Sequence, residues 1–226
     1  MKRNCSKVVA MLVFTLSVMC VCGVNAQNLT FQNLQFEGVA GLNMSDMGGL
    51  GSKAGFHIGA KAEIPLPSLA DGSYANAGIM LSFKGNSYLG LKTAANYLEI
   101  PIHVGYKRAI NENLSIFGEA GPYIAFGLFG KMDIEYDMDL TGYGSTSSKM
   151  QINTFDNDLG INRFDIGAGL KAGVVIKQKY TVSIGYDWGF IDAYKNSSLS
   201  KMDEDYIDLT PKMTNTNLSI SLGYKF

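Results

Sequence analysis

The chain contains two histidines, His57 and His103, which are the side chains best suited to act as a general base near neutral pH. Glu99 lies four positions before His103, so in a strand the two would share one face but stand roughly 13 Å apart. No serine stands two residues from either histidine, and a nucleophile–base pair could therefore form only between strands. Because nothing local supports such a pair, we predict that the protein is not an enzyme and that both histidines belong to a polar network.

Acidic residues gather in two stretches, 156–158 and 203–208, whose carboxylate oxygens are of the kind that calcium binds. Neither stretch has the spacing of a dedicated calcium-binding loop. The glycines at Gly167 and Gly169 fall in the middle of an expected strand, where they serve curvature and close packing rather than phosphate binding. We therefore expect no metal ion, nucleotide or other cofactor.

Residues 1–26 have the organisation of an export signal. A basic start is followed by the uncharged apolar stretch Val8–Val21, and Val24 and Ala26 supply small or aliphatic side chains before Gln27. We predict a signal peptide over 1–26, with cleavage between Ala26 and Gln27, and a single domain over 27–226. A membrane anchor is the alternative, but its apolar stretch is short for a helix that needs roughly 20 residues.

The three cysteines all lie in this segment, at Cys5, Cys20 and Cys22. Lipid attachment at Cys20 or Cys22 is a further alternative, although Met19 and Val21 are poor neighbours for that processing. Cleavage leaves a chain without disulfide bonds. It also lowers the formal net charge from −1 to −4, because the segment holds three cations and no acid. An acidic chain of this kind is not expected to bind nucleic acid.

After the signal, segments with alternating apolar and small or polar residues recur between turn residues. Successive side chains of a strand point to opposite sides, so each segment has one apolar and one polar face. We predict about eight strands, each with the roughly 9–11 residues that a tilted strand needs to cross a bilayer. They are expected near Leu34–Met44, Ala54–Ile64, Tyr74–Phe83, Tyr97–Lys107, Leu114–Phe129, Arg163–Ile176, Tyr180–Phe190 and Asn217–Phe226.

The lengths of the connections favour a membrane barrel over a soluble sandwich. In outer-membrane barrels both chain ends face the periplasm, periplasmic turns are short and external loops are longer. The two longest connections, Gly130–Asn162 and Ile191–Thr216, fall at the third and last external positions, whereas Asn111–Asn113 is a short periplasmic turn. The predicted fold class is therefore all-β, a transmembrane antiparallel up-and-down β-barrel with its apolar face toward lipid.

Alternation continues into the third external loop, where apolar residues between Met132 and Leu140 alternate with the acids Asp133 to Asp139. We expect strands five and six to continue beyond the membrane as a protruding ribbon on an eight-stranded barrel. An extra spanning hairpin, which would give ten strands, is the alternative. Glycine and serine crowd the second arm, which favours eight.

With the apolar faces toward lipid, charged residues of mixed and nearly balanced sign face the lumen. An interior of about eight strands is just wide enough for side chains to fill, and buried charges are tolerated when they are paired. We predict a structural charge network that plugs the lumen, and a narrow proton or solute pathway is the alternative. The network comprises Glu37, Lys61, Glu63, Glu99, His103, Glu119, Arg163, Asp165, Lys171 and Asp187, with His57, Lys84, Lys107 and Lys225 on the same face.

Three segments resemble the family of PorT-type outer-membrane β-barrel proteins: Asn96–Ile102 (NYLEIPI), Phe164–Gly169 (FDIGAG) and the closing Asn217–Phe226 (NLSISLGYKF). The resemblance spans essentially the whole mature chain. It implies an eight-stranded meander barrel in the outer membrane of a Gram-negative cell, inserted by the barrel-assembly machinery. It supplies no catalytic residues, and the secretion role associated with the family name is not carried over.

The closing strand resembles the terminal signal that the assembly machinery reads, with Leu222, Tyr224 and Phe226 as its apolar and aromatic residues. We therefore expect a monomeric outer-membrane protein with a structural or surface-interaction role. Its expected partners are outer-membrane lipid and lipopolysaccharide, the assembly machinery during biogenesis, and an external partner that meets the long loops. A narrow pore or a secretion accessory is the alternative, and a hydrolase acting at the barrel rim is the least favoured.

Overall fold

The fold is given by a computed structural model that describes residues 34–47, 51–88, 91–138, 146–155, 161–192 and 214–226. The predicted signal peptide with its cleavage site, Ala26 and Gln27, lies outside these residues. The acidic stretches 156–158 and 203–208 lie outside them too.

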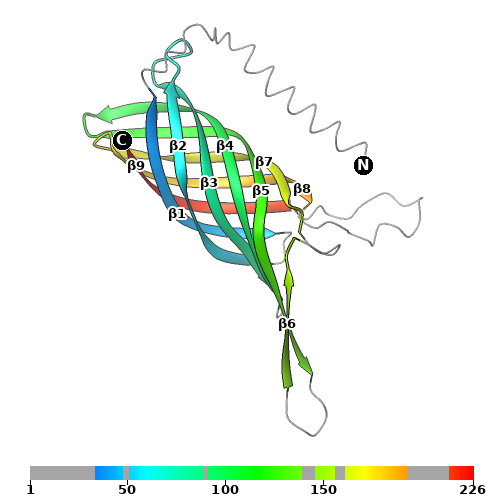
Figure 1. The fold of residues 1–226 in the computed structure, drawn as a ribbon. Coiled ribbons are helices and arrows are strands. Elements are labelled where there is room, and N and C mark those ends of the chain that lie inside the picture. The colour runs from blue at the N-terminus through cyan, green and yellow to red at the C-terminus, as the bar shows by residue number, and fades with distance from the viewer. Residues whose placement is uncertain (1–33, 48–50, 89–90, 139–145, 156–160, 193–213) are drawn as a thin grey trace, which may run out of the picture.

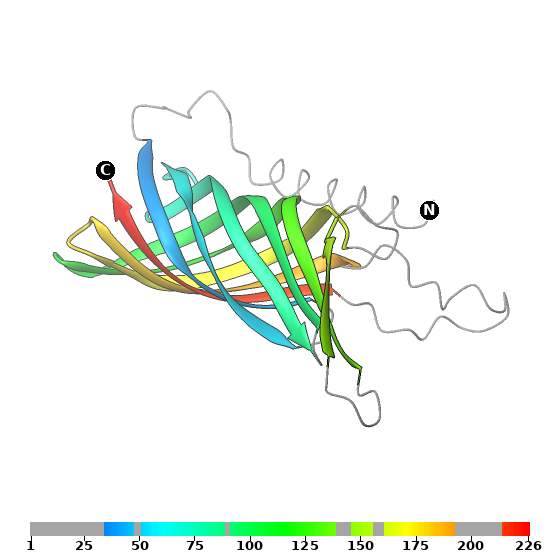
Figure 2. The ribbon, with the colours of Figure 1, turned by 60° about the horizontal axis from the view of Figure 1, so that its bottom comes forward.

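Antiparallel strands dominate the described chain (Figures 1 and 2). They are β1 (Gln35–Met47), β2 (Ser52–Pro65), β3 (Ser73–Tyr88), β4 (Leu91–Asn111), β5 (Leu114–Met138), β6 (Thr146–Asn153), β7 (Phe164–Ile176), β8 (Tyr180–Asp192) and β9 (Thr214–Lys225).

Eight of these strands close into a barrel, because each pairs with a neighbour on both sides. The pairing runs from β1 through β5 in chain order, passes from β5 to β7, and returns through β8 and β9 to β1. The predicted fold class, an eight-stranded up-and-down barrel, is confirmed. Among the described residues β6 pairs with β5 alone, so it does not add a ninth barrel strand.

The ribbon forms differently from the sequence prediction. Strand β5 continues past the barrel, as expected, and its residues Lys131–Met138 pair with β6 (Figure 1). The second arm, however, is not a continuation of the next barrel strand, because β6 ends at Asn153 and β7 begins only at Phe164. Between them, the Thr154 amide donates to the Gly130 carbonyl and the Ile161 amide donates to the Thr154 carbonyl, so these residues bond to the barrel end and to each other.

The two ends of the barrel differ in their connections. The turn end holds the start of β1, the end of β9 and the connections 66–72, 112–113 and 177–179. The last of these is tight: Lys177 and Gln178 both have positive φ, and the Lys179 amide donates to the Ile176 carbonyl at 3.1 Å. This is the geometry of a two-residue hairpin turn that matches strand twist. The opposite end, from which the β5–β6 ribbon projects, is the loop end.

The outer face of the barrel is apolar over most of its height. Because side chains alternate, the apolar set of each strand points away from the lumen and stays exposed. Ile220 on β9 and Leu170 on β7 are each more than half exposed, at 56% and 54%. The same face carries Phe36, Leu42, Phe56, Ile58, Ile79, Ile100, Ile102, Val104, Ile116, Ile124, Ile184, Leu218 and Leu222.

Exposed aromatic residues lie at both ends of this band. Tyr180, Tyr224 and Phe226 cluster at the turn end, with the first two rings 5.5 Å apart and the last two 5.2 Å apart. Trp188 and Phe190 are exposed near the loop end of β8. Such aromatic girdles mark the two water interfaces of membrane barrels. Among the described residues, no helix is long and apolar enough to span a membrane.

Strand β4 starts six residues earlier than the sequence suggested, at Leu91 rather than Tyr97. The segment 91–96 is held on both sides, by β3 and by β5, so its backbone groups are satisfied. Its outward positions, Lys92, Ala94 and Asn96, hold no large apolar side chain. Alternation therefore could not reveal it.

Candidate functional site

The lumen is the candidate site, because polar and charged side chains from all eight barrel strands point into it. Because side chains alternate along a strand and the large apolar ones point outward, the side chains that point inward are mostly small or polar. Buried polar residues there include Glu37, Asn43, Ser45, His57, Lys61, Asn76, Ser82, Lys84, Asn86, Thr93, His103, Glu119, Asp165, Thr181, Ser183, Asn215, Asn217, Ser219, Ser221 and Lys225.

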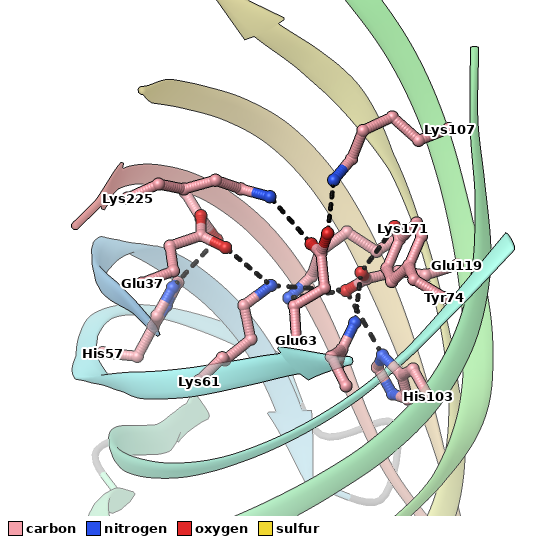
Figure 3. A network of polar contacts seen from close by, with 12 residues as sticks. Glu37, His57, Lys61, Glu63, Tyr74, His103, Lys107, Glu119, Lys171 and Lys225 are labelled. Carbon is pink, nitrogen blue, oxygen red and sulfur yellow. Dashed lines mark hydrogen bonds and ion pairs between the residues drawn. The ribbon is translucent and has the colours of Figure 1, made fainter. Parts of the chain in front are cut away.

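Glu119 of β5 is the centre of the network (Figure 3). Its Oε2 accepts hydrogen bonds from Asn76 Nδ2 at 2.7 Å and from Tyr74 Oη at 3.1 Å. Its Oε1 lies 3.5 Å from Lys61 Nζ and 3.4 Å from His103 Nδ1. Glu119 is only 3% exposed, so this carboxylate depends on its neighbours rather than on solvent.

Lys61 and a further lysine, Lys171, extend the network across the barrel. Lys61 also reaches Glu37 Oε2, at 3.7 Å, and thereby joins β1 and β2 to β5. Lys171 of β7 approaches Glu119 Oε1 to 4.0 Å from the other side. The central carboxylate is therefore enclosed by cations from two strands that do not touch each other in the sheet.

At the turn end, Glu63 binds two lysines at once (Figure 3). Lys107 Nζ lies 2.6 Å from Glu63 Oε1, and Lys225 Nζ lies 2.7 Å from Glu63 Oε2. Lys107 also stands over the Tyr74 ring, 4.7 Å from its centroid, which is a cation–π distance. This cluster ties the last strand of the barrel to β2 and β4.

Nearer the loop end, Lys84 forms an ion pair with Glu99. Its ammonium also lies between two rings, 5.9 Å from the centroid of Tyr97 and 5.8 Å from that of Tyr123. The Tyr123 hydroxyl in turn donates to Asp165 Oδ2 at 3.1 Å. Charge and aromatic packing therefore hold this layer together.

The remaining carboxylates of this layer are bound by asparagines of β9. Asn215 Nδ2 donates to Asp165 Oδ2 at 3.0 Å, and Asn217 Nδ2 donates to Asp187 Oδ2 at 3.1 Å. These amides explain how acidic residues on neighbouring strands remain buried where cations are fewer.

An apolar layer covers the charge network at the loop end. It is a cluster of Ala95, Tyr97, Tyr123, Ala125, Phe155 and Ile161. Phe155 is 1% exposed and packs edge-on to Tyr97, with ring centroids 5.8 Å apart. Thr154 anchors this connection, because its hydroxyl donates to the Ala94 carbonyl at 3.0 Å.

Little space is left between these side chains. A mid-lumen cavity of about 40 Å³ is lined by Asn43, His57, Met80, Ser82, Glu99, Pro101, His103, Tyr123, Lys171, Asp187, Asn217 and Ser219. A second cavity, of about 10 Å³, lies beside Glu119 and Lys61 on the turn-end side. These volumes suit a few water molecules and one water molecule, respectively.

The structure brings together all but one of the residues predicted for the lumen network. Glu37, Lys61, Glu63, His103, Glu119 and Lys171 form or adjoin the central and turn-end clusters, and Glu99, Asp165 and Asp187 lie nearer the loop end. Arg163 is the exception. It precedes β7, and its guanidinium stands 5.2 Å from the Phe155 ring centroid and donates to the Gly127 carbonyl. The sequence placed Arg163 inside β7, whereas the strand begins one residue later, at Phe164.

Sequence reasoning missed the aromatic residues of the lumen. Tyr97 and Tyr123 share the inward parity of Glu99 and Glu119, so strict alternation could have identified them. Phe155 gave no such signal, because it lies in a connection and not in a strand.

His57 and its partners on two other strands form a group that resembles a catalytic triad. Its Nδ1 lies 2.6 Å from Asn43 Oδ1, and its Nε2 lies 2.9 Å from Ser221 Oγ. In such a triad Ser221 would stand in the place of the nucleophile, His57 in that of the base, and Asn43 in that of the group that orients the base. Ser221 is 2% exposed, however, and the neighbouring cavity holds only water-sized molecules. The three side chains therefore tie β1, β2 and β9 together inside the lumen.

Among the described residues, no group of three or more histidine, cysteine or acidic side chains is placed to hold a metal ion. The acids Asp156 and Asp158, and those of 203–208, lie outside these residues.

The solved structures that match this chain have low sequence identity to it. Neisserial surface protein A has 13% identity and a TM-score of 0.45, with 85% of this chain and 97% of that chain covered. Ail, the attachment invasion locus protein of Yersinia pestis, has 12% identity and a TM-score of 0.41, with coverage of 85% and 98%. The outer membrane enzyme PagL has 16% identity and a TM-score of 0.39, with coverage of 85% and 98%.

No curated protein sequence matches the chain. A family model does match, over residues 16–195, and its description is outer membrane protein beta-barrel domain. The match covers most of the chain and agrees with the closed eight-stranded barrel and its apolar outer face. The chain therefore belongs to the family of outer-membrane β-barrel proteins.

Proposed function

We propose that the protein is a closed outer-membrane anchor that presents the β5–β6 ribbon at the cell surface for interaction with an external partner. One observation carries this proposal. The first half of β5 lines a filled lumen through Glu119 and Tyr123, and its last part leaves the barrel to pair with β6. The same strand therefore links the plugged barrel rigidly to the projecting ribbon.

The base of the ribbon supports a presenting role. Thr154 N donates to the Gly130 carbonyl at 3.1 Å, and Ile161 N donates to the Thr154 carbonyl at 2.9 Å. Together with buried Phe155, these bonds fix the ribbon to the loop end of the barrel. Binding functions are commonly placed on projecting segments that a rigid scaffold positions.

The lumen supports an anchor better than a transport pore. Its charges are held by ion pairs or hydrogen bonds, its cavities are water-sized, and an apolar layer covers the loop end. Because the enclosed Ser221–His57–Asn43 group has no room for a substrate, we also propose that the protein has no hydrolase activity. The lumen charges then have a structural role.

Finer aspects of the proposal rest on sequence. The NYLEIPI segment, Asn96–Ile102, supports membership of the PorT-type group within the wider barrel family. A cleaved signal peptide over 1–26 would bring the chain to the periplasm, and the closing residues Leu222, Tyr224 and Phe226 suit recognition by the barrel-assembly machinery. Lipid and lipopolysaccharide would surround a single barrel, with the turn end facing the periplasm.

Cysteine labelling on intact cells tests the surface display. The native cysteines all lie in residues 1–26, so single cysteines can be introduced into an otherwise thiol-free mature chain. We expect Gln151→Cys, in the ribbon, to react with a membrane-impermeant maleimide. Asn113→Cys, in a turn at the opposite end, is the matched control and should react only after the outer membrane is permeabilised. Labelling of Asn113→Cys alone on intact cells would reverse the orientation and contradict the proposal.

A further inference from the structure

The β5–β6 ribbon presents a free strand edge in the part of the chain that the structure describes. There β6 pairs only with β5, from Thr146 to Asn153, and the register of this ladder is continuous. The β4–β5 and β8–β9 ladders, by contrast, both contain register shifts. A regular edge strand of this kind is a template on which another strand can form hydrogen bonds.

Alternate residues of β6 direct their amides and carbonyls to the free edge. The Thr154 amide donates to the Gly130 carbonyl of β5, and the backbone groups of successive residues point to opposite sides of a strand. The even-numbered residues of β6 therefore face β5, whereas Lys149 and Gln151 face the edge. The side-chain bond of 2.9 Å from Gln151 to Asp133 agrees, because side chains approach most closely at pairs without backbone hydrogen bonds.

The two edges of the ribbon differ in sequence. Beyond Ile134, where its pairing with β4 ends, β5 carries the acids Glu135 and Asp137, and charges on an edge strand oppose further pairing. Strand β6 has one charge, Lys149, and no proline. Two strands alone are marginally stable in water, so the end of the ribbon gains stability from a further strand. The edge that can accept this strand is that of β6.

A second copy of β6 fits this edge in a defined register. In an antiparallel ladder, residues that face the edge must lie opposite residues that do the same. The two such registers with the greatest overlap are centred on Lys149 and on Met150. The first places Lys149 opposite its own copy, where like charges repel, and the second places Lys149 opposite Gln151. The favoured pair is therefore centred on Met150.

From this edge we propose that two copies of the protein pair through β6, antiparallel and centred on Met150. The inference rests on the proposed surface display of the ribbon, and it identifies the external partner as a second copy of this chain. Pairing joins the two ribbons into one sheet in the order β5, β6, β6, β5. The acids Glu135 and Asp137 then occupy both outer edges, so association stops at two copies.

Antiparallel pairing also determines where the two barrels lie. The ribbon projects from the loop end of the barrel (Figures 1 and 2), and antiparallel partners point in opposite directions. The barrels therefore lie at opposite ends of the joint sheet, in two facing membranes rather than side by side in one. A single contact uses one short strand from each copy, but many copies on each membrane strengthen it by multivalency.

Disulfide capture between vesicles tests the pairing in the full mature chain. Residues 27–226 contain no cysteine, so single cysteines can be introduced, and two vesicle populations carry chains with different affinity tags. Opposite residues without backbone hydrogen bonds have Cα atoms about 4.5 Å apart, which is within disulfide range. We expect Met150→Cys, opposite its own copy, to link differently tagged chains about tenfold faster than Thr146→Cys at the strand end.

A proline on the edge separates strand pairing from side-chain contact. Lys149→Pro removes an amide that faces the edge but no bond to β5, and edge strands tolerate proline at such positions. Added to Met150→Cys, it should slow the cross-link about tenfold, whereas Lys149→Ala should leave the rate within about twofold. In a separate chain with Asp133→Cys and Gln151→Cys, an internal disulfide shows that Lys149→Pro keeps the ribbon paired.

Three results would overturn the inference. Absent or equal cross-linking of Met150→Cys and Thr146→Cys would exclude the register. A cross-link that survives Lys149→Pro while the internal disulfide forms would exclude backbone pairing. Disulfides confined to chains of one vesicle population would exclude contact between facing membranes. Failure of the surface display is distinguishable from all three, because Gln151→Cys would then stay unlabelled on intact cells.

Discussion

At the scale of single residues, Glu119 shows how a barrel of eight strands tolerates charge in its interior. Asn76 and Tyr74 donate to one of its oxygens, and Lys61 and His103 approach the other. A buried ion pair gains little over an apolar pair, but removal of one member leaves the rest without compensation. The network is therefore sensitive to single substitutions.

Substitution of Glu119 tests this sensitivity. We expect Glu119→Ala to lower the free energy of unfolding by about 3–5 kcal/mol, because Lys61 would remain buried without its main carboxylate. Equilibrium unfolding in urea from lipid vesicles measures the change. Glu112→Ala, on an exposed turn at the end of the barrel, is the matched control and should stay within about 0.5 kcal/mol. Equal stabilities of the two variants would show that the network does not hold the barrel together.

At the scale of elements, each barrel strand has one face for lipid and one for the network. Strand β9 shows the division clearly, with Leu218, Ile220 and Leu222 exposed and Ser219 and Ser221 buried. A slip of one residue would exchange the two faces, so the lipid fixes the register of every strand.

A charge on the outer face of β9 tests this assignment. Ile220 lies near the middle of the strand and is exposed, so Ile220→Arg should cost about 2–4 kcal/mol of unfolding free energy in a bilayer. Leu34→Arg, beyond the start of β1 at the turn end, places the same charge near the water interface and should cost about 0–1 kcal/mol. The same unfolding assay in vesicles compares them. A negligible cost at position 220 would mean that this face does not meet lipid.

Alternation in the sequence was enough to predict the barrel strands, because lipid and lumen impose opposite demands on neighbouring residues. It did not reveal the start of β4 at Leu91, where the outward residues Lys92, Ala94 and Asn96 are not large and apolar, or the break that makes β6 a separate strand. The turn of Thr154 and Phe155 over the loop end was equally hidden. Their positions depend on contacts with Ala94, Tyr97 and Gly130, which are distant in sequence.

At the scale of the whole molecule, strand parity was enough to predict which charged residues point inward, but not which residues they contact. Parity puts Glu63, Lys107 and Lys225 on the inner face without showing that the two lysines share one carboxylate. The link between His57 and Ser221 was also invisible, because it joins residues from opposite ends of the chain through closure of the barrel. Closure is a property of the assembled sheet and cannot be seen in a single segment.

Export and maturation determine which chain reaches the membrane. If residues 1–26 are a signal peptide, the protein purified from outer membranes should begin at Gln27 and contain no cysteine. Intact-mass and amino-terminal peptide spectrometry measure the start directly. Ala26→Pro should block the cleavage and leave a longer chain in the inner membrane. A mature protein that retains residues 1–26, or that carries lipid on Cys20 or Cys22, would contradict this maturation.

The central claim is that the interior of this outer-membrane barrel is closed. Its cavities of about 40 and 10 Å³ are too small for a continuous column of hydrated ions. Single-channel recording of the purified protein in planar lipid bilayers, with a large porin as positive control, measures this most directly. We predict no current steps above those of the bare bilayer, at either polarity, from protein that shows heat-modifiable migration. Sustained ion conductance from the folded barrel would contradict a closed interior.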